Sequence, residues 1–292
     1  MTERDTGVGE THETEVITAF EGDLPSGTRT PSALRHRIRN IAPAAVAFVL
    51  VIALWEGATR LFKIKAFILP APSVIVARFI ETSDVVWGAG LNTFIEAFGG
   101  LIGGTLLGLT VAFATVRWSS VREGLLPFAV AANSVPIIAL APIANGMFGL
   151  ANPVGKMAVV AVVVFFPVMI NTARGLIEVE ANELELMRSY AATPRELMWR
   201  VRVPHALPYF FSAMKVTTVL SVIAAIVAEY FGGSLDVLGQ YILNKASLSI
   251  YPDAWAGILV ASIIGVGLYV LVLLAERLVM PWHVSLRAAD SS

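Results

Sequence analysis

The sequence predicts an all-α integral membrane protein, and two properties of the chain carry that prediction. Of its 292 residues, 56% are hydrophobic and only 15% are charged, with a mean hydropathy of +0.73. The apolar residues also gather into runs of roughly twenty, the length of helix that crosses a hydrocarbon core about 30 Å thick. Soluble globular domains are less apolar and more charged. We therefore expect six membrane-spanning helices.

The chain divides into a polar N-terminal segment, a membrane domain and a short tail. Residues 1–40 are rich in acidic residues and end in a cluster of arginines, which predicts a disordered acidic tail with a basic flank. Residues 41–287 form the expected membrane domain, and 288–292 the C-terminal tail. A cleaved signal peptide is the competing interpretation of the first apolar run, but that run begins late and others follow it.

The apolar runs follow one another with short polar connections. They lie at residues 41–58, 91–116, 125–148, 157–171, 209–231 and 254–275. Segment 60–90 is expected outside the membrane, with a short surface helix over 74–79 that Ser73 caps. Glycines about four residues apart in the second run predict close packing against a neighbouring helix.

Charge supports one orientation of these spans. Fourteen of the 21 Lys and Arg residues fall on the N-terminal tail, the C-terminal tail and the alternate connections, six fall on the opposite side, and Lys215 lies within a span. Basic residues accumulate on the cytoplasmic side of membrane proteins. We therefore expect a multi-pass protein of the cell (plasma or inner) membrane with both termini in the cytoplasm.

A charged, helix-prone insert over residues 182–208 separates the fourth and fifth runs. Apolar and charged residues alternate at helical spacing in its first part, which predicts an amphipathic helix over 182–190. Thr193 as N-cap and Pro194 in the first turn predict a second helix over 195–201. Two later prolines, Pro204 and Pro208, are expected to interrupt any continuous helix before the fifth span. The plainer interpretation is an amphipathic loop of an unrelated membrane protein.

The insert resembles the cytoplasmic motif of the permeases of ATP-binding-cassette importers. That motif reads Glu-Ala-Ala, three residues, Gly, nine residues, Ile-x-Leu-Pro, and the chain matches its spacing without a gap. Glu185 stands at the Glu, Leu186 and Met187 at the two Ala, Ala191 at the Gly, and Val201, Val203 and Pro204 at Ile, Leu and Pro. At Ala191, either the turn needs no positive φ or the alanine tolerates mild strain. The surrounding run is similar to the branch that imports nitrate, sulfonates and taurine.

The resemblance implies the transmembrane fold of a type I importer, with the insert as a coupling helix between spans four and five. It also implies three partners: an ATPase subunit in whose groove the insert docks, an extracytoplasmic solute-binding protein, and a second permease copy, giving a homodimer in the lipid membrane. The residues expected to dock are Glu185, Leu186, Met187, Arg188, Tyr190, Ala191, Ala192, Pro194, Val201, Val203 and Pro204.

Catalytic chemistry is not expected in this chain. It lacks a Gly-x-x-x-x-Gly-Lys-Ser/Thr loop, so ATP and Mg²⁺ would be bound by the separate ATPase subunit, and no cofactor is expected here. There are no cysteines and the four histidines are scattered, which disfavours a metal site. The balanced net charge of −1 gives no reason to expect nucleic acid as a partner.

Polar residues within spans are the candidates for the translocation pathway. Asn133 and Ser134, beside Pro136, are expected to line a cavity at a broken helix, although helix-to-helix hydrogen bonds explain such residues equally well. Glu229 and Glu96 are buried-charge candidates near span ends, where interfacial placement is the alternative. Lys215 is expected to reach the inner surface along its aliphatic stem.

The function expected from these features is a permease that forms the path for a small organic solute. The resemblance allows sulfonate-, taurine- or nitrate-like solutes, or solutes like pyrimidine thiamine precursors and flavins. The alternative is a secondary transporter or channel subunit, which would have no ATPase partner.

Overall fold

The computed structural model describes residues 33–281, apart from 119, 121, 125–126 and 128–135, and every main element in that part is helical. In chain order the elements are α2 (Ala33–Leu61), α3 (Pro72–Glu81), α4 (Ser83–Arg117), α6 (Ile137–Phe148), α7 (Pro153–Ile177), α8 (Ala181–Ser189), α9 (Pro194–Leu197), the π-helical turn η1 (Met198–Arg202), α10 (Val203–Tyr230), α11 (Leu238–Ser247) and α12 (Tyr251–Val279). The all-α prediction is confirmed.

Four helical stretches of the described chain are long and apolar enough to cross a membrane. They are α4, α7, the stretch Pro194–Tyr230 that ends in α10, and α12. These correspond to the second, fourth, fifth and sixth predicted runs, and each extends beyond its run into polar flanks. Helix α4, for example, begins at Ser83, within the segment expected outside the membrane. The first run lies in α2, and α6 covers the described second half of the third.

Helices α4 and α7 pack closely because α4 presents glycines to its neighbour. A β-carbon at Gly100 would collide with the Val160 side chain, and one at Gly104 would collide with the carbonyl oxygen of Ala161. In lipid, the hydrophobic effect does not drive helices together, so their association depends on close packing. Small residues favour this packing because they let two helix backbones approach closely. The glycine spacing therefore predicted close packing correctly, and the structure identifies α7 as the partner.

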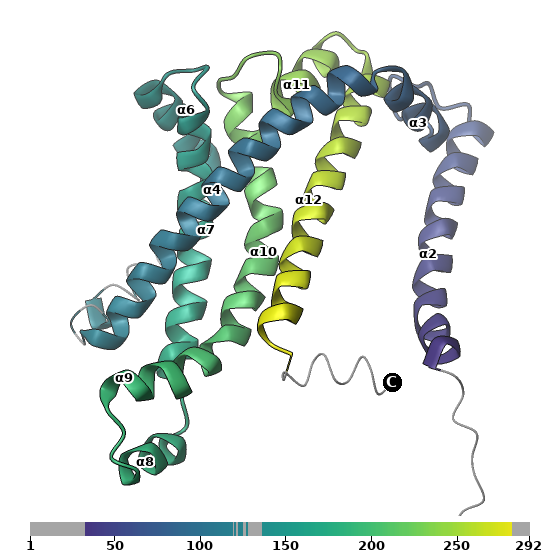
Figure 1. Cartoon of the computed structure of the whole chain (residues 1–292). Helices are drawn as coiled ribbons and strands as arrows, with labels where there is room; N and C mark the ends of the chain where they lie inside the picture. The colour runs from purple at the N-terminus through teal and green to yellow at the C-terminus, as the bar shows by residue number, and fades with distance from the viewer. Residues whose placement is uncertain (1–32, 119, 121, 125–126, 128–135, 282–292) are drawn as a thin grey trace, which may run out of the picture.

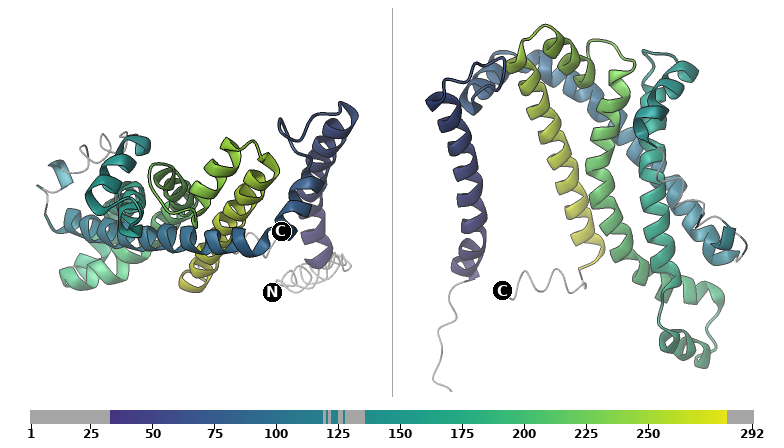
Figure 2. Two further views of the ribbon diagram at one scale, coloured as in Figure 1. Left: turned by 90° about the horizontal axis from the view of Figure 1, so that it is seen from above. Right: turned by 180° about the vertical axis from the view of Figure 1, so that it is seen from behind.

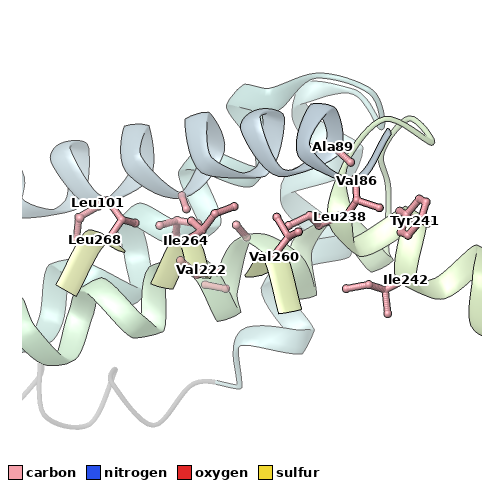
Figure 3. Close-up of a cluster of buried hydrophobic side chains, with 14 of the residues drawn as sticks. Val86, Ala89, Leu101, Val222, Leu238, Tyr241, Ile242, Val260, Ile264 and Leu268 are labelled. Carbon is pink, nitrogen blue, oxygen red and sulfur yellow. The ribbon is translucent and has the colours of Figure 1, made fainter. Parts of the chain in front are cut away.

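The main buried cluster joins α4, α7, α10, α11 and α12. Figure 3 shows Val86 and Leu101 of α4 facing Val260 and Leu268 of α12, with Leu238 at the start of α11. Side chains from five elements fill this space, so α11 is part of the packed bundle although it is too short to span a membrane.

The two ends of the bundle differ in their elements. Figures 1 and 2 show α3, α6 and α11 at one end, and α8 and α9 projecting from the other. Helix α2 stands apart from the other long helices over most of its length and approaches them at the end that carries α3. There the rings of Trp55 and Trp255 lie 5.3 Å apart.

Two expectations for the N-terminal part need correction. Helix α2 already begins at Ala33, so the arginine cluster assigned to the disordered tail is helical, while residues 1–32 lie outside the described part. Ser73 does not cap α3, because Pro72 occupies the first helical position. Instead, the Ser73 N–H and hydroxyl donate to the carboxylate of Glu56 on α2, at 3.0 and 2.8 Å.

The expected break at Pro204 and Pro208 is also wrong. Helix α10 contains both prolines, and helical backbone continues into it from α9 through η1. In η1 the Val203 N–H donates to the carbonyl of Met198, five residues back. This wider turn shifts the hydrogen-bond pattern just before Pro204, which has no N–H to donate. The second helix of the insert is therefore continuous with the fifth span.

Candidate functional site

The insert forms a protrusion of two short helices at one end of the molecule (Figure 1). No side chain of α8, α9 or η1 is buried within the chain. Three of its large apolar side chains are well exposed: Leu186 by 56%, Tyr190 by 75% and Trp199 by 60%. Burying such a side chain contributes about 1.5–3 kcal/mol, so this surface is suited to a protein partner.

The turn between α8 and α9 contains a strained alanine. Ala191 has a φ of +54°, in the left-handed region. Its N–H donates to the carbonyl of Arg188 at 2.9 Å, and the Ala192 N–H donates to that of Met187 at 3.1 Å. These two bonds form the helix-ending motif that most often carries glycine at the left-handed position. Of the two alternatives for Ala191, the structure therefore supports the one in which alanine tolerates strain.

The start of α9 is fixed by a capping box. The Glu196 N–H donates to the Thr193 hydroxyl at 3.3 Å, and the Thr193 N–H donates to the Glu196 carboxylate at 2.9 Å. Pro194 occupies the first turn, where a missing N–H costs nothing. The predictions of Thr193 as N-cap and of a helix starting at this proline are confirmed.

The base of the protrusion is anchored to the ends of three long helices. Arg202 donates to the Leu176 carbonyl at 2.8 Å, and His205 Nδ1 lies 2.7 Å from the Gly175 carbonyl, to which it donates. Both carbonyls belong to the last turn of α7, where carbonyl groups lack partners within the helix. Below these bonds, Ala206 packs in a buried cluster with Leu176 and with Ala112 of α4.

The structure divides the predicted docking residues into two groups. Those on α8 and the turn lie on the free part of the protrusion: Glu185, Leu186, Met187, Arg188, Tyr190, Ala191 and Ala192. Pro194 begins α9, whereas Val201, Val203 and Pro204 lie at the base, with Val203 packed against the buried cluster. The anchoring roles of Arg202 and His205 were missed, although both lie next to the motif.

Two of the pathway candidates, Pro136 and Glu229, lie within the described residues. Asn133 and Ser134 lie outside the described residues, and Pro136 is the exposed N-cap of α6. Glu229 is fully buried near the end of α10, where its carboxylate accepts the N–H of Gly239. Lys215 does not extend alone to the surface, because its ammonium group forms a 2.7 Å ion pair with Glu276 of α12.

Comparison with known proteins matches the chain to a transport family. Residues 104–282 match the model of the binding-protein-dependent transport system inner membrane component family. The formylaminopyrimidine transport permease protein ThiX of Halalkalibacterium halodurans is 29% identical over 237 residues, covering 81% of this chain and 94% of that protein. The riboflavin transport system permease protein RibX of Chloroflexus aurantiacus is 30% identical over 244 residues, covering 82% and 90%.

A solved structure supports the fold. A chain in the crystal structure of an amino acid ABC transporter with histidines superposes with a TM-score of 0.54 at 17% identity, covering 68% of this chain and 96% of that one. The family match and the four apolar helices agree on a multi-pass membrane protein. The chain belongs to the family of binding-protein-dependent transport system inner membrane components.

Proposed function

We propose that the chain is the permease subunit of an ATP-driven importer and that its exposed insert docks onto a separate ATPase subunit. The observation that carries this proposal is the protrusion itself. Its two helices are held by a capping box and by bonds to α7, yet no side chain of α8, α9 or η1 is buried. The chain fixes the conformation of this surface but does not cover it, so the surface is suited to binding a partner protein.

The insert would work as a lever. Helical backbone runs without a break from Pro194 to Tyr230, so a displacement of α9 is passed directly to α10. Arg202 and His205 tie the same lever to the end of α7. When the ATPase subunits close on ATP, the protrusion would move with them and swing these two spans. ATP and Mg²⁺ would be bound by the ATPase, and this chain would supply the path.

The proposed topology has six spans with both termini and the insert in the cytoplasm. Arg117, Arg174 and Arg277 stand in the last turns of α4, α7 and α12, at the end of the bundle that carries the protrusion. Basic residues at this end fit the cytoplasmic side. Helix α2 and the segment that leads into α6 would supply the two remaining spans.

A second copy of the chain is part of the proposal. Helix α2 exposes large apolar side chains along its length, including Phe48 by 68% and Leu54 by 70%. A cleft of about 430 Å³ between α10 and α12 is lined mainly by apolar side chains. These faces would be covered by lipid and by the second copy. Cross-linking in native membranes followed by mass measurement would detect the homodimer.

The proposed solute is a small organic molecule delivered by an extracytoplasmic binding protein. ThiX and RibX are named for a formylaminopyrimidine and for riboflavin, which are both nitrogen heterocycles. We place Asn133, Ser134 and Pro136 on the path, because proline frees backbone groups that a cavity can use. Screening heterocycles and sulfonates against the binding protein encoded with this chain would separate the two solute classes.

The test of the docking surface uses single charges. Tyr190→Asp and Ala192→Glu would place an unpaired carboxylate in the groove that receives the insert, which is strongly unfavourable. Purification of the tagged chain in mild detergent is expected to bring down an ATPase with the wild type and with neither variant. Vanadate-sensitive ATP hydrolysis in the purified material should follow the same pattern.

The matched control is Leu248→Glu, which adds the same charge at a side chain 60% exposed at the opposite end of the molecule. It should retain the ATPase. If Tyr190→Asp and Ala192→Glu also retained it and transported normally, the docking assignment would be wrong. If the wild-type chain came down with no ATPase, a secondary transporter or channel subunit would replace the importer.

A further inference from the structure

Two buried carboxyl groups meet where α4, α10 and α11 join, away from the insert. Glu96 of α4 is 5% exposed, and Glu229 of α10 is fully buried. Glu96 Oε2 and Glu229 Oε1 are both buried without a hydrogen-bond partner, and the two carboxyl groups lie close enough for their charges to interact. The docking surface does not use either residue, and a buried pair of acids needs a physical explanation.

Glu229 caps the neighbouring helix. The first residues of α11 receive no side-chain cap from Val237, which precedes them. Instead the Leu238 N–H donates to the Thr93 hydroxyl of α4 at 2.9 Å, and the Gly239 N–H donates to Glu229 Oε2 at 2.5 Å. The partial positive charge of a helix N-terminus favours the ionised carboxylate, so the negative charge belongs on Glu229.

The close approach of α11 to this carboxylate depends on a glycine. A β-carbon at Gly239 would lie 2.6 Å from the Glu229 β-carbon and 2.7 Å from its Oε2. The next residue adds a further tie, because the Gln240 side-chain amide donates to the Glu229 carbonyl at 2.6 Å. The start of α11 is therefore built around the Glu229 side chain.

The unsatisfied oxygens of the two acids indicate that one proton is bound between them. With both acids ionised, Glu96 Oε2 and Glu229 Oε1 are buried and have no donor. Carboxylates only accept hydrogen bonds, so two of them in contact cannot satisfy each other. A single proton on Glu96 would let it donate to Glu229, and each acid would then have a partner for its unsatisfied oxygen.

The balance of charges also indicates one bound proton for the two acids. Lys156 of α7 is 1% exposed, and its ammonium group donates to the carbonyls of Leu150 and Asn152 at 2.5 and 3.2 Å. Within the described part of the chain, it is the cation that acts on both acids. The other titratable neighbours are Asp236, whose charge repels Glu96, and Tyr230. One carboxylate balances Lys156, and a second would be an uncompensated buried charge.

We propose that the Glu96–Glu229 pair is a proton-binding site, with one proton held on Glu96 and shared with Glu229, and that this proton fastens α11 to the spans α4 and α10. The step is simple: Glu96 binds a proton from water and keeps it between the two acids. At high pH the proton leaves, two negative charges lie in contact, and the attachment of α11 weakens. The proposal does not depend on the solute or on the ATPase.

The test begins with infrared spectroscopy of the purified chain in lipid. A protonated carboxylic acid has a carbonyl stretch that a carboxylate lacks, so the wild type should show this band at neutral pH and lose it on alkaline titration. Glu96→Gln should abolish the band, because the amide replaces the acid. The matched control Glu81→Gln, at an exposed carboxylate paired with Arg78, should leave the band in place.

Thermal unfolding supplies the second readout. The amide that Glu96→Gln introduces can donate to Glu229 as the protonated acid does, so this variant should keep the neutral-pH Tm. It should also remove the fall in Tm that the wild type shows at alkaline pH. Glu229→Gln should lower the Tm across the whole range, because the charge that caps α11 and balances Lys156 is lost.

Two outcomes would overturn the proposal. The first is a wild-type chain without the protonated-acid band at neutral pH. If the Tm then rose with added sodium chloride but not with choline chloride, a sodium ion would occupy the place assigned to the proton. The second is a Glu96→Gln variant as destabilised as Glu229→Gln, which would mean that both acids are ionised.

Discussion

A carboxylate side chain binds the start of a helix in opposite ways at two places: the junction of α4, α10 and α11, and the protrusion. At the junction, Glu229 accepts the Gly239 N–H in the first turn of a helix from another part of the chain and is fully buried. At the protrusion, Glu196 accepts the Thr193 N–H of its own helix and remains partly exposed. The first arrangement is completed within the chain, whereas the second orders a surface that the chain leaves uncovered.

This difference separates stability from interaction. Buried polar groups are costly unless each has a partner, so an error at the junction should unfold the protein. Exposed groups exchange protein contacts for water at little cost, so changes in the protrusion should affect docking more than folding. The start of α3 combines the two cases, because the carboxylate that binds it, Glu56, comes from another helix but its hydrogen bonds are exposed.

Removing the buried cation should give the largest effect. Lys156→Met keeps the length of the side chain but leaves the charge of Glu229 unbalanced and two carbonyls without their donor. Leaving a buried charge uncompensated in this way costs about 3–5 kcal/mol of unfolding free energy. The loss should appear as a lower midpoint of thermal unfolding in detergent.

A double variant tests the cause of that loss. Adding Glu229→Gln to Lys156→Met removes the uncompensated charge, so the pair should be destabilised by less than the sum of the two single changes. Arg188→Met in the exposed protrusion is the matched control and should leave the midpoint unchanged. Strict additivity of the two junction changes would show that Lys156 does not balance Glu229.

A smaller effect is expected when each cap loses its hydroxyl. Thr93→Val leaves the buried Leu238 N–H without an acceptor, which costs about 1–3 kcal/mol. Thr193→Val leaves the Glu196 N–H to water, and losing an exposed N-cap costs about 1 kcal/mol. Hydrogen exchange should show faster exchange at the start of α11 in the first variant and of α9 in the second. Equal costs at the two sites would contradict the contrast between junction and protrusion.

Much of the fold could be predicted from the sequence, because helices that cross lipid require long apolar runs, which are easily recognised. The apolar runs that became α4, α7, α10 and α12 were predicted from length and composition, and the N-cap Thr193 from local residue order. Helix ends were less predictable. Turns that flank a span can remain helical while polar, as Ser83 at the start of α4 shows.

The site was predictable only where it is local. The spacing of apolar and charged residues predicted the helix in the free part of the protrusion. The helical continuity through Pro204, in contrast, depends on a π-helical turn that no residue pattern predicts. The contact of Glu96 with Glu229 joins helices far apart in the chain. Their similar positions near the outer ends of two spans were the available signal, but pairing them also required the positions of α11 and Lys156.

The smallest effect should come from relieving the strain at Ala191. Ala191→Gly places glycine where φ is +54°, which removes a left-handed penalty of about 1–2 kcal/mol. Glycine also makes the unfolded chain more flexible, which lowers the free energy of unfolding by about 0.4–1 kcal/mol and offsets part of this gain. The expected net result is a modest rise in protection of the α8 amides in hydrogen exchange. Ala192→Gly is the matched control: Ala192 has no positive φ, so glycine there should lower the protection. If both variants lowered it, the turn would not adopt the left-handed conformation in the membrane, and the strain at Ala191 would be absent from the working protein.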